Sequence, residues 1–320
     1  MLFINKTMNL KVSVIIPTYN RANLLPRAIQ SVLNQTFQDF ELIVVDDGST
    51  DNTRKIVEEF QKNDRRIEYI WQENFGGTSK PINTGIKVSQ GEYIALLEDD
   101  DEWLPEKLEK QLEVFQNSKK ENLGFVSCNI LIVNEKTKAI KTHNIPKYND
   151  ITFSEKPVDN KFFVSFSTPM IKREVINKVG FLDENLKFRG DKDIFLRISK
   201  KYNFDFVPTP LVKCHIHHGK NVTEMPFYDR SLSDLLYIHR NYRDLYKRYP
   251  KICSREQRSI GNLYVLLGDC RQGRKYFLRS IATYPFNFKS YQNLLLSFLG
   301  SRAFMYFFNL KKKLISIFFE

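Results

Sequence analysis

The stretch YIALLEDDDEWLP, Tyr93 to Pro105, sets five consecutive acidic residues, Glu98 to Glu102, directly after an apolar run. Such an apolar run is typical of a buried strand. Carboxylates crowded at its end repel one another unless something positive lies among them. A helix N-terminus would explain Asp101 and Glu102, because acids favour a first helical turn and Pro105 suits its first position. It explains the three acids before them poorly, so a divalent cation is expected there.

The sequence around this stretch alternates between strand and helix patterns. Short apolar runs predict strands at 11–17, 41–47, 66–72, 91–98 and 123–130. Apolar residues at helical spacing predict helices at 23–35, 48–60, 83–90 and 105–115. This alternation favours a parallel, doubly wound sheet, in which ligands bind beyond the carboxyl ends of the strands. We therefore expect Tyr19 and Asn20, Asp46 and Asp47, and the acidic run to converge on one edge.

The rest of the chain is less regular. Residues 135–161 are polar, 163–186 read as strand, short helix and loop, 189–202 as an amphipathic helix, and 204–223 as extended chain. The remainder is helical, and 263–287 resembles one helix pair of a tetratricopeptide-like array. One such pair is too weak a signal to predict a repeat protein.

Charge is distributed unevenly along the 320 residues. The net charge is +12, and the segment from Arg230 to Glu320 holds 17 basic and 5 acidic residues, while the rest holds 32 of each. The basic segment is therefore expected to face something anionic. The start lacks the features of a signal peptide, and no apolar run is long enough to span a membrane. Four scattered cysteines suggest a reducing compartment.

Taken together, the motifs resemble those of a family-2 glycosyltransferase of the GT-A fold. The matching segments are VSVIIPTYN (12–20), FELIVVDDGSTDNT (40–53), NFGGTSKPINTGI (74–86), GEYIALLEDDDEW (91–103) and FRGDKDIFLRI (188–198). The resemblance implies a Rossmann-like, mostly parallel sheet flanked by helices, with a C-terminal helical extension. It divides the chain into a nucleotide-sugar-binding half at 10–130, an acceptor-binding half at 131–228 and a basic, aromatic helical tail at 229–320.

The resemblance also implies a reaction. An inverting, metal-dependent enzyme would move a sugar from a nucleotide-sugar, by family habit a UDP-sugar, to an acceptor hydroxyl during synthesis of a surface polysaccharide or glycolipid. The acceptor is then a glycan or a lipid-linked molecule. The attacking hydroxyl needs a general base, and the departing diphosphate needs a cation, Mn²⁺ or Mg²⁺.

The donor-side roles implied by the family fall on five residues. Asp47 would accept from uracil N3–H, with a helix cap or turn as its alternative. Pro17 and Tyr19 would line the base pocket, although Tyr19 could equally be core packing. Asp99 would reach the ribose or a metal-bound water, and Asp100 would ligate the metal and bridge to the diphosphate.

Three further roles depend on positions where the chain departs from the family pattern. The loop at 74–86 lacks the family's arginine, so Lys80 is the cation expected to contact phosphate. In the family, the aspartate of a Glu-Asp pair acts as the general base. Here Gly190 stands in place of the glutamate, so Asp191 is expected to be the base, with Asp193 as the alternative. His218 is expected to be a further metal ligand or phosphate contact, with a surface loop or a zinc site as alternatives.

Two other classes of function compete with a transferase. A nucleotide-sugar-binding module without turnover is conceivable because the family's Glu and Arg are missing. The basic tail could also bind nucleic acid, but no nucleic-acid motif is present, so no nucleic acid is expected. Instead the tail, ending in LKKKLISIFFE (310–320), is expected to hold a cytoplasmic protein at the inner face of the membrane. Its alternative is a solvated helical face that packs on the catalytic domain.

Overall fold

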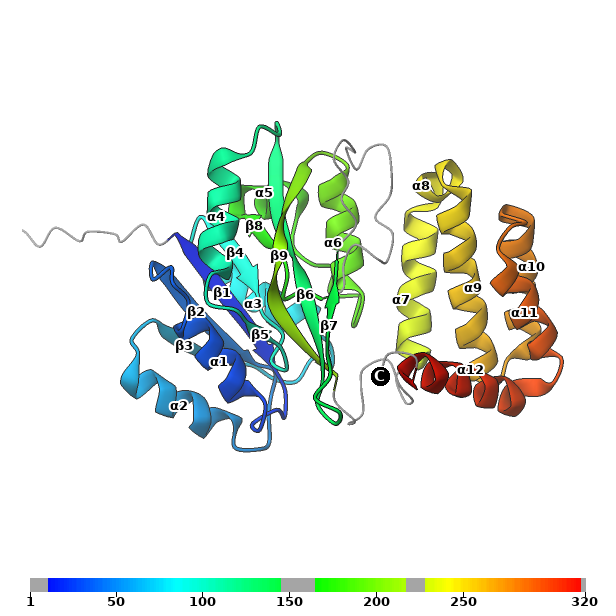
Figure 1. Ribbon diagram of the computed structural model, residues 1–320, viewed down its shortest axis with the longest axis horizontal. Coiled ribbons are helices and arrows are strands. Elements are labelled where there is room, and N and C mark those ends of the chain that lie inside the picture. The colour runs from blue at the N-terminus through cyan, green and yellow to red at the C-terminus, as the bar shows by residue number, and fades with distance from the viewer. Residues whose placement is uncertain (1–10, 145–164, 217–227, 318–320) are drawn as a thin grey trace, which may run out of the picture. The chain divides into compact units, whose positions relative to one another are not determined.

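The computed structural model describes residues 11–144, 165–216 and 228–317 (Figure 1). The chain forms two compact units, of which the first comprises Met1–Leu186 with Gly190–His217. The second comprises Lys187–Arg189 with His218–Glu320. Every described strand belongs to the first unit, and the described helices after β9 belong to the second.

The first unit is built on a nine-stranded sheet in the order β3-β2-β1-β4-β8-β6-β9-β5, with β7 paired to β6. The strands are β1 Val12–Thr18, β2 Phe40–Asp46, β3 Ile67–Trp71, β4 Tyr93–Leu96, β5 Glu102–Trp103, β6 Leu123–Asn134, β7 Ile140–His143, β8 Met170–Lys172 and β9 Asn203–Ile216. β3, β2, β1 and β4 are parallel, as predicted. β8 runs antiparallel to both β4 and β6, so the mostly parallel sheet that was predicted also contains antiparallel pairs.

Alternate side chains of the parallel strands bury themselves on opposite faces. The helices of this unit are α1 Leu25–Leu33, α2 Thr53–Asn63, α3 Ser79–Val88, α4 Lys107–Asn117, α5 Arg173–Val179 and α6 Gly190–Ser199. Val14 and Val44 join one apolar cluster with residues of α1, α2 and α4. Ile15 and Ile43 join another with residues of α3, α5 and α6. A strand buried on both faces reads as a continuous apolar run, which is why these strands could be predicted.

The acidic run does not open a helix. Glu102 and Trp103 form β5, paired with Lys213 and Val212 of β9, and α4 begins only at Lys107. Trp103 is buried, and its indole Nε1 donates a hydrogen bond of 2.9 Å to the carbonyl of residue 167. The helix-terminus explanation of the last two acids is therefore wrong, because burial of the tryptophan holds this segment extended.

The second unit is helical in its described part. Its helices are α7 Tyr228–Asn241, α8 Arg243–Arg248, α9 Pro250–Leu266, α10 Cys270–Thr283, α11 Phe288–Ser297 and α12 Gly300–Ile317. α9 and α10 approach closely, since a Cβ on Gly261 would lie 2.6 Å from the ring of Phe277. Asp269 caps α10 by accepting from the backbone N–H of Gln272 at 2.9 Å. None of the described helices combines the length and apolar character needed to cross a membrane.

Candidate active site

The carboxyl ends of β1, β2 and β4 meet at one edge of the sheet. Thr18, the last residue of β1, pairs with Asp46 at the end of β2. Its carbonyl accepts from the backbone N–H of Asp47 at 2.9 Å, and its Oγ1 donates to Asp99 Oδ2 at 2.8 Å. The structure thus places Asp47 and Asp99 on either side of the end of β1.

The loops that follow β1 and β2 are joined to each other. Asn20 has a positive φ of 52°, and its Oδ1 accepts from the backbone N–H of Thr50 at 2.8 Å. Gly48 also has a positive φ, and a Cβ there would lie 2.8 Å from the backbone nitrogen of Asn74. This position therefore requires glycine both for its conformation and for the close approach of the next loop.

Pro17 and Tyr19 lie at the surface of this edge. Pro17 is half-buried, and the Tyr19 side chain is 47% exposed. Core packing, the alternative for Tyr19, is not what the structure shows. Both residues are placed where they could line a ligand site.

Asp47 is buried and organises the loop that follows β3. Its Oδ2 accepts from the backbone N–H groups of Phe75 and Gly76 at 3.0 and 3.3 Å, and its Oδ1 accepts from Gln72. It is not the cap of α2, which begins after Asn52. The carboxylate therefore shapes the glycine-containing loop, and the predicted contact with a base stays a prediction.

Asp46 is a structural acid. Its oxygens accept from the backbone N–H of Ser49 at 2.8 Å and from the Tyr69 hydroxyl at 2.7 Å. Burial, with this hydrogen bond and the charge of Asp46, raises the pKa of Tyr69. Asp46 thereby ties β3 to the loop that follows β2.

Glu98 and Asp101 are joined by the hydroxyl of one serine, Ser165. The Ser165 hydroxyl lies 2.6 Å from Glu98 Oε2 and 2.9 Å from Asp101 Oδ2, and Ser167 Oγ lies 2.6 Å from the same Asp101 oxygen. The Ser165 hydroxyl can donate to only one of the two carboxylates at a time, and two charged carboxylates at this separation repel each other. Burial, followed by the charge of Asp101, raises the pKa of Glu98 well above its usual range. Burial also raises the pKa of Asp101, to about 6.

Asp100 and Glu102 are partnered by cations of the chain. Asp100 Oδ2 lies 3.4 Å from Arg21 Nη1, and the Asp100 side chain remains 27% exposed. Glu102 Oε1 lies 2.9 Å from Lys213 Nζ. The cation predicted at Glu98, Asp99 and Asp100 stays a prediction, and these three acids also have partners in the chain, namely Ser165, Thr18 and Arg21.

Asp99 and Asp100 form a donor set that fits a divalent cation. Burial, followed by the charge of Asp100, raises the pKa of Asp99 to about 7. The described residues contain no group of three or more histidines, cysteines or acids arranged to hold a metal. Mg²⁺ commonly takes one or two carboxylates from the protein and the rest of its ligands from phosphates and water. Two adjacent carboxylates, of which Asp100 already faces the positive guanidinium of Arg21, suit such a site.

Lys80 and His218 complete the predicted phosphate and metal contacts. Lys80 is the second residue of α3, and its Nζ lies 5.3 Å from the centre of the Phe75 ring, in the loop that Asp47 holds. His218 lies outside the described residues. Neither role is tested by the structure.

Asp191 stands in the first turn of α6, which packs against the start of α3. A Cβ on Gly190 would lie 2.5 Å from Ser79 Oγ, and that hydroxyl donates to the Leu186 carbonyl at 2.6 Å. The charge of Asp191 is one of those that raise the pKa of Glu98, so it lies within electrostatic range of the acidic run. Its rival Asp193 is buried and ion-paired to Arg197 at 2.7 Å.

A second group of charged residues at this edge escaped the sequence analysis. Arg27 Nη1 and His215 Nδ1 each lie 2.7 Å from Glu135 Oε1, and Arg27 Nη2 donates to the carbonyl of Asp100 at 2.8 Å. Arg27, the largest cause, lowers the pKa of Glu135 to about 2. Burial chiefly lowers the pKa of His215. The only signal in the sequence was the pair Arg21 and Arg27, which follows the first motif. The other members, Glu135 and His215, lie more than a hundred residues further along the chain.

Known proteins share this architecture and these motifs. A family model described as Glycosyl transferase family 2 matches residues 13–180, just over half of the 320 residues. This chain belongs to glycosyl transferase family 2. The predicted family and the prediction of a glycosyltransferase are thereby confirmed.

Two bacterial proteins illustrate the relatives of this family-2 glycosyltransferase. An uncharacterized glycosyltransferase of Rickettsia prowazekii is 29% identical over 266 residues, which cover 81% of this chain and 78% of the relative. The putative teichuronic acid biosynthesis glycosyltransferase TuaG of Bacillus subtilis is 33% identical over 190 residues, which cover 59% of this chain and 72% of the relative.

Solved structures confirm the predicted GT-A fold. The structure of S. aureus TarS 1-349 in complex with UDP-GlcNAc gives a TM-score of 0.58 at 17% identity, covering 88% of this chain and 91% of that one. The mannosyltransferase PcManGT of Pyrobaculum calidifontis, in complex with GDP-Man and Mn²⁺, gives 0.53 at 16% identity, covering 85% and 75%. At these identities the likeness shows the fold alone.

Proposed function

We propose that this glycosyltransferase is inverting and metal-dependent, and that it moves a sugar from a UDP-sugar to a hydroxyl of a glycan or lipid-linked acceptor. The observation that carries this proposal is the meeting of Asp47, Asp99 and Asp100 at one sheet edge, with Asp191 brought toward them by the tight contact between α6 and α3. UDP-GlcNAc in the TarS complex supports the choice of uridine. TuaG, by its name, supports a surface polysaccharide as product.

The donor would lie along the strand ends. Asp47 would accept from the base between Pro17 and Tyr19, Asp99 would contact the ribose, and Lys80 would contact the phosphates. A Mn²⁺ or Mg²⁺ ion bound with the donor would neutralise charge that develops on the departing diphosphate. Mn²⁺ in the PcManGT complex supports this choice.

The metal itself would be held by Asp100, with Asp99 or His218 contributing. The Asp100 side chain is 27% exposed, and its present partner, Arg21, is 3.4 Å away, a distance long for an ion pair between groups in direct contact. Arg21 could therefore give way to a cation that binds with the diphosphate.

Asp191 would act as general base. It removes the proton from the acceptor hydroxyl as that oxygen attacks the anomeric carbon in line with the departing diphosphate, which inverts the anomeric configuration. Asp193 is unsuited to this task because its carboxylate is already committed to Arg197.

The acceptor half at 131–228 and the tail at 229–320 would serve lipid-linked substrates at the inner face of the membrane. Large apolar side chains of the second unit are exposed, among them Phe286, Phe288, Leu295, Phe298 and Leu299. Together with the 17 basic residues from Arg230 to Glu320 they fit an anionic membrane surface. All four cysteines lie in described ranges and are free thiols, in keeping with a cytoplasmic location.

The assignment of Asp191 as general base is tested by substituting Asp191 and Asp193 separately, two acids in the first turn of α6. Asp191→Asn is expected to lower the transfer rate by about 10²- to 10⁴-fold while UDP affinity is retained, because only proton removal is lost. Asp193→Asn is expected to lower thermal stability and leave the transfer rate nearly unchanged. Normal transfer by Asp191→Asn would refute the assignment. UDP binding by the wild type without any turnover would point instead to a binding module.

A further inference from the structure

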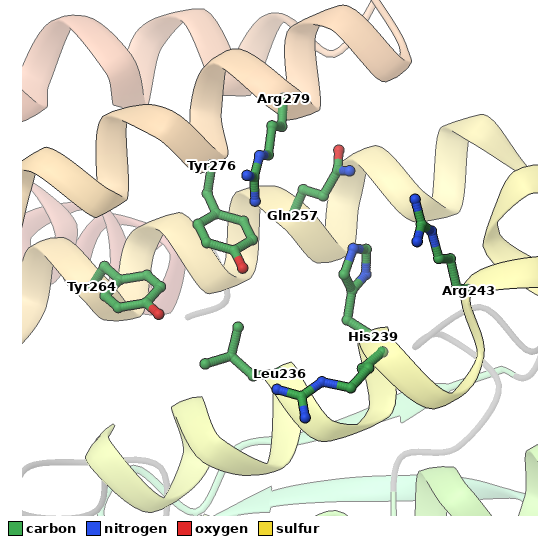
Figure 2. A pocket seen from close by; sticks show the side chains of 8 residues that line it. Leu236, His239, Arg243, Gln257, Tyr264, Tyr276 and Arg279 are labelled. Atoms are coloured by element: carbon green, nitrogen blue, oxygen red, sulfur yellow. The ribbon is translucent and has the colours of Figure 1, made fainter.

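The second unit contains a cavity of about 660 Å³ that is lined by residues of α7, α8, α9 and α10 (Figure 2). Its main lining residues are Arg240, Arg243, Gln257, Tyr264, Tyr276 and Arg279. A neighbouring hollow of about 300 Å³ shares Arg243 and Gln257 with it. The volume is that of a typical small-ligand site.

The lining is strongly positive. Three arginines from three helices face the cavity, together with His239, and the described residues that line it include no carboxylate. Guanidinium groups bind carboxylates and phosphates in bidentate fashion and retain their charge at every physiological pH. The cavity is therefore suited to an anion.

Two tyrosines form an apolar wall. The rings of Tyr264 and Tyr276 are nearly parallel, with centres 5.5 Å apart and planes 24° apart. The Arg279 guanidinium carbon lies 5.1 Å from the centre of the Tyr276 ring. Tyrosine combines an apolar face with a polar tip, which suits a ligand that has apolar C–H faces and hydroxyl groups.

Gln257 supplies an unmet acceptor at the same place. It is only 8% exposed, it lines both hollows, and Figure 2 shows its side chain beside those of Tyr276 and His239, which come from the neighbouring helices. Its Oε1 has no hydrogen-bond partner among the described residues. A buried acceptor of this kind is normally satisfied, so a ligand with a hydroxyl donor is expected to reach it.

We propose that this cavity binds a segment of an anionic glycan, about two or three sugar rings that carry carboxylate or phosphate groups. The arginines take the charge, the tyrosines take a ring face, and Gln257 accepts from a hydroxyl. Nucleic acid fits less well, because its recognition relies on an extended basic groove rather than a compact hollow with a buried acceptor. The binding site depends on the second unit alone, whereas a role for the bound glycan as acceptor rests on the proposed function.

The experiment is a calorimetric titration of the full chain, without donor, using three saccharide probes: trigalacturonate, a phosphorylated maltotriose and the neutral maltotriose. At least one of the two anionic probes is expected to bind about tenfold or more tighter than maltotriose, because only they engage the arginines. Which of them binds tells carboxylate from phosphate.

Variants locate the binding. The double substitution Arg243→Gln/Arg279→Gln is expected to weaken the anionic probe by about tenfold or more. Gln257→Leu, similar in size but without an acceptor, is expected to weaken anionic and neutral probes alike. Arg271→Gln is the matched control, since Arg271 is an exposed arginine of the same helix α10 that does not line the cavity. Unchanged melting temperatures of the surface variants show that folding is intact.

Three results would overturn the proposal. The first is that neither anionic saccharide binds. The second is that the arginine double variant loses no more affinity than Arg271→Gln. The third is that an RNA oligonucleotide or phosphatidylglycerol vesicles bind through these arginines while the saccharides do not. UDP is titrated into the same samples. If the wild type binds UDP but neither anionic saccharide, the result contradicts this site alone. If the wild type does not bind UDP, the result contradicts the proposed function.

Discussion

At the scale of single residues, the acidic run after β4 is tolerated because its members are neutralised in different ways. Burial raises the pKa of Glu98, Asp101 accepts from two serines, and Asp100 faces an arginine. Asp99 accepts from Thr18. Burial and like charge are thus concentrated at the end of one strand, as is common at functional sites. What remains for a metal is the pair Asp99 and Asp100.

Lys107 offers a test of burial at the same scale. It is completely buried, its Nζ donates to Gln111 Oε1 at 2.8 Å and lies 3.9 Å from the centre of the Trp103 ring, and burial lowers its pKa to about 7. Between pH 7 and the ordinary lysine pKa of 10.5, the unfolded chain holds a proton that the folded chain lacks. The free energy of unfolding contributed by this group therefore rises with pH across that window.

The corresponding measurement is urea unfolding at pH 7, 8 and 9.5, for the wild type and for Lys107→Met. The stability difference between the two proteins isolates this lysine from the other titrating groups. It is expected to shift in favour of the wild type as pH rises. A difference that stays constant from pH 7 to 9.5 would show that Lys107 is protonated in the fold throughout.

At the scale of elements, the start of α6 is positioned by its contact with α3. Gly190→Ala would place a Cβ 2.5 Å from Ser79 Oγ and 3.1 Å from Leu182 Cδ2, so the start of α6 must shift. Because Asp191 is the next residue, we expect the transfer rate to fall by about 10- to 100-fold while UDP affinity changes little. Steady-state kinetics and UDP titration measure the two effects separately.

A second substitution identifies the cause. Ser79→Ala removes the hydroxyl that the new methyl group meets, so the double variant Gly190→Ala/Ser79→Ala is expected to recover part of the lost rate. A full rate in Gly190→Ala alone would show that the approach of these two helices does not position the base. Equal rates in the single and double variants would assign the loss to another contact.

The elements also show what could be predicted from the sequence and what could not. The strands buried on both faces, and the convergence of their carboxyl ends, could be predicted from apolar runs such as 12–18, because this side-chain pattern is local in the sequence. β8 has only three residues, and so short an apolar run does not specify a strand direction, so its antiparallel return could not be anticipated. Likewise, Arg21, Ser165 and Lys213 contact the acids only after the chain has folded. Their spacing in the sequence does not predict these contacts.

At the scale of the whole molecule, the charge asymmetry and exposed apolar side chains predict membrane attachment. The wild type is expected to sediment with phosphatidylglycerol vesicles at low salt, and less so as screening increases. The double substitution Phe298→Ser/Leu299→Ser, at side chains 67% and 62% exposed, is expected to weaken vesicle binding by about tenfold or more. Leu278→Ser, at an exposed leucine of α10, is the control. Absence of vesicle binding by the wild type would rule out this role of the tail.

The central claim, that Asp99 and Asp100 receive a cation together with a nucleotide diphosphate, is tested most directly by calorimetric titration of UDP with and without Mn²⁺. The wild type is predicted to bind UDP at least about tenfold more tightly when Mn²⁺ is present, a gain of about 1.4 kcal/mol or more. Asp100→Asn, which keeps the shape of the side chain, is predicted to lose that gain while it still binds UDP weakly. An equal Mn²⁺ dependence in Asp100→Asn, or none in the wild type, would contradict the claim.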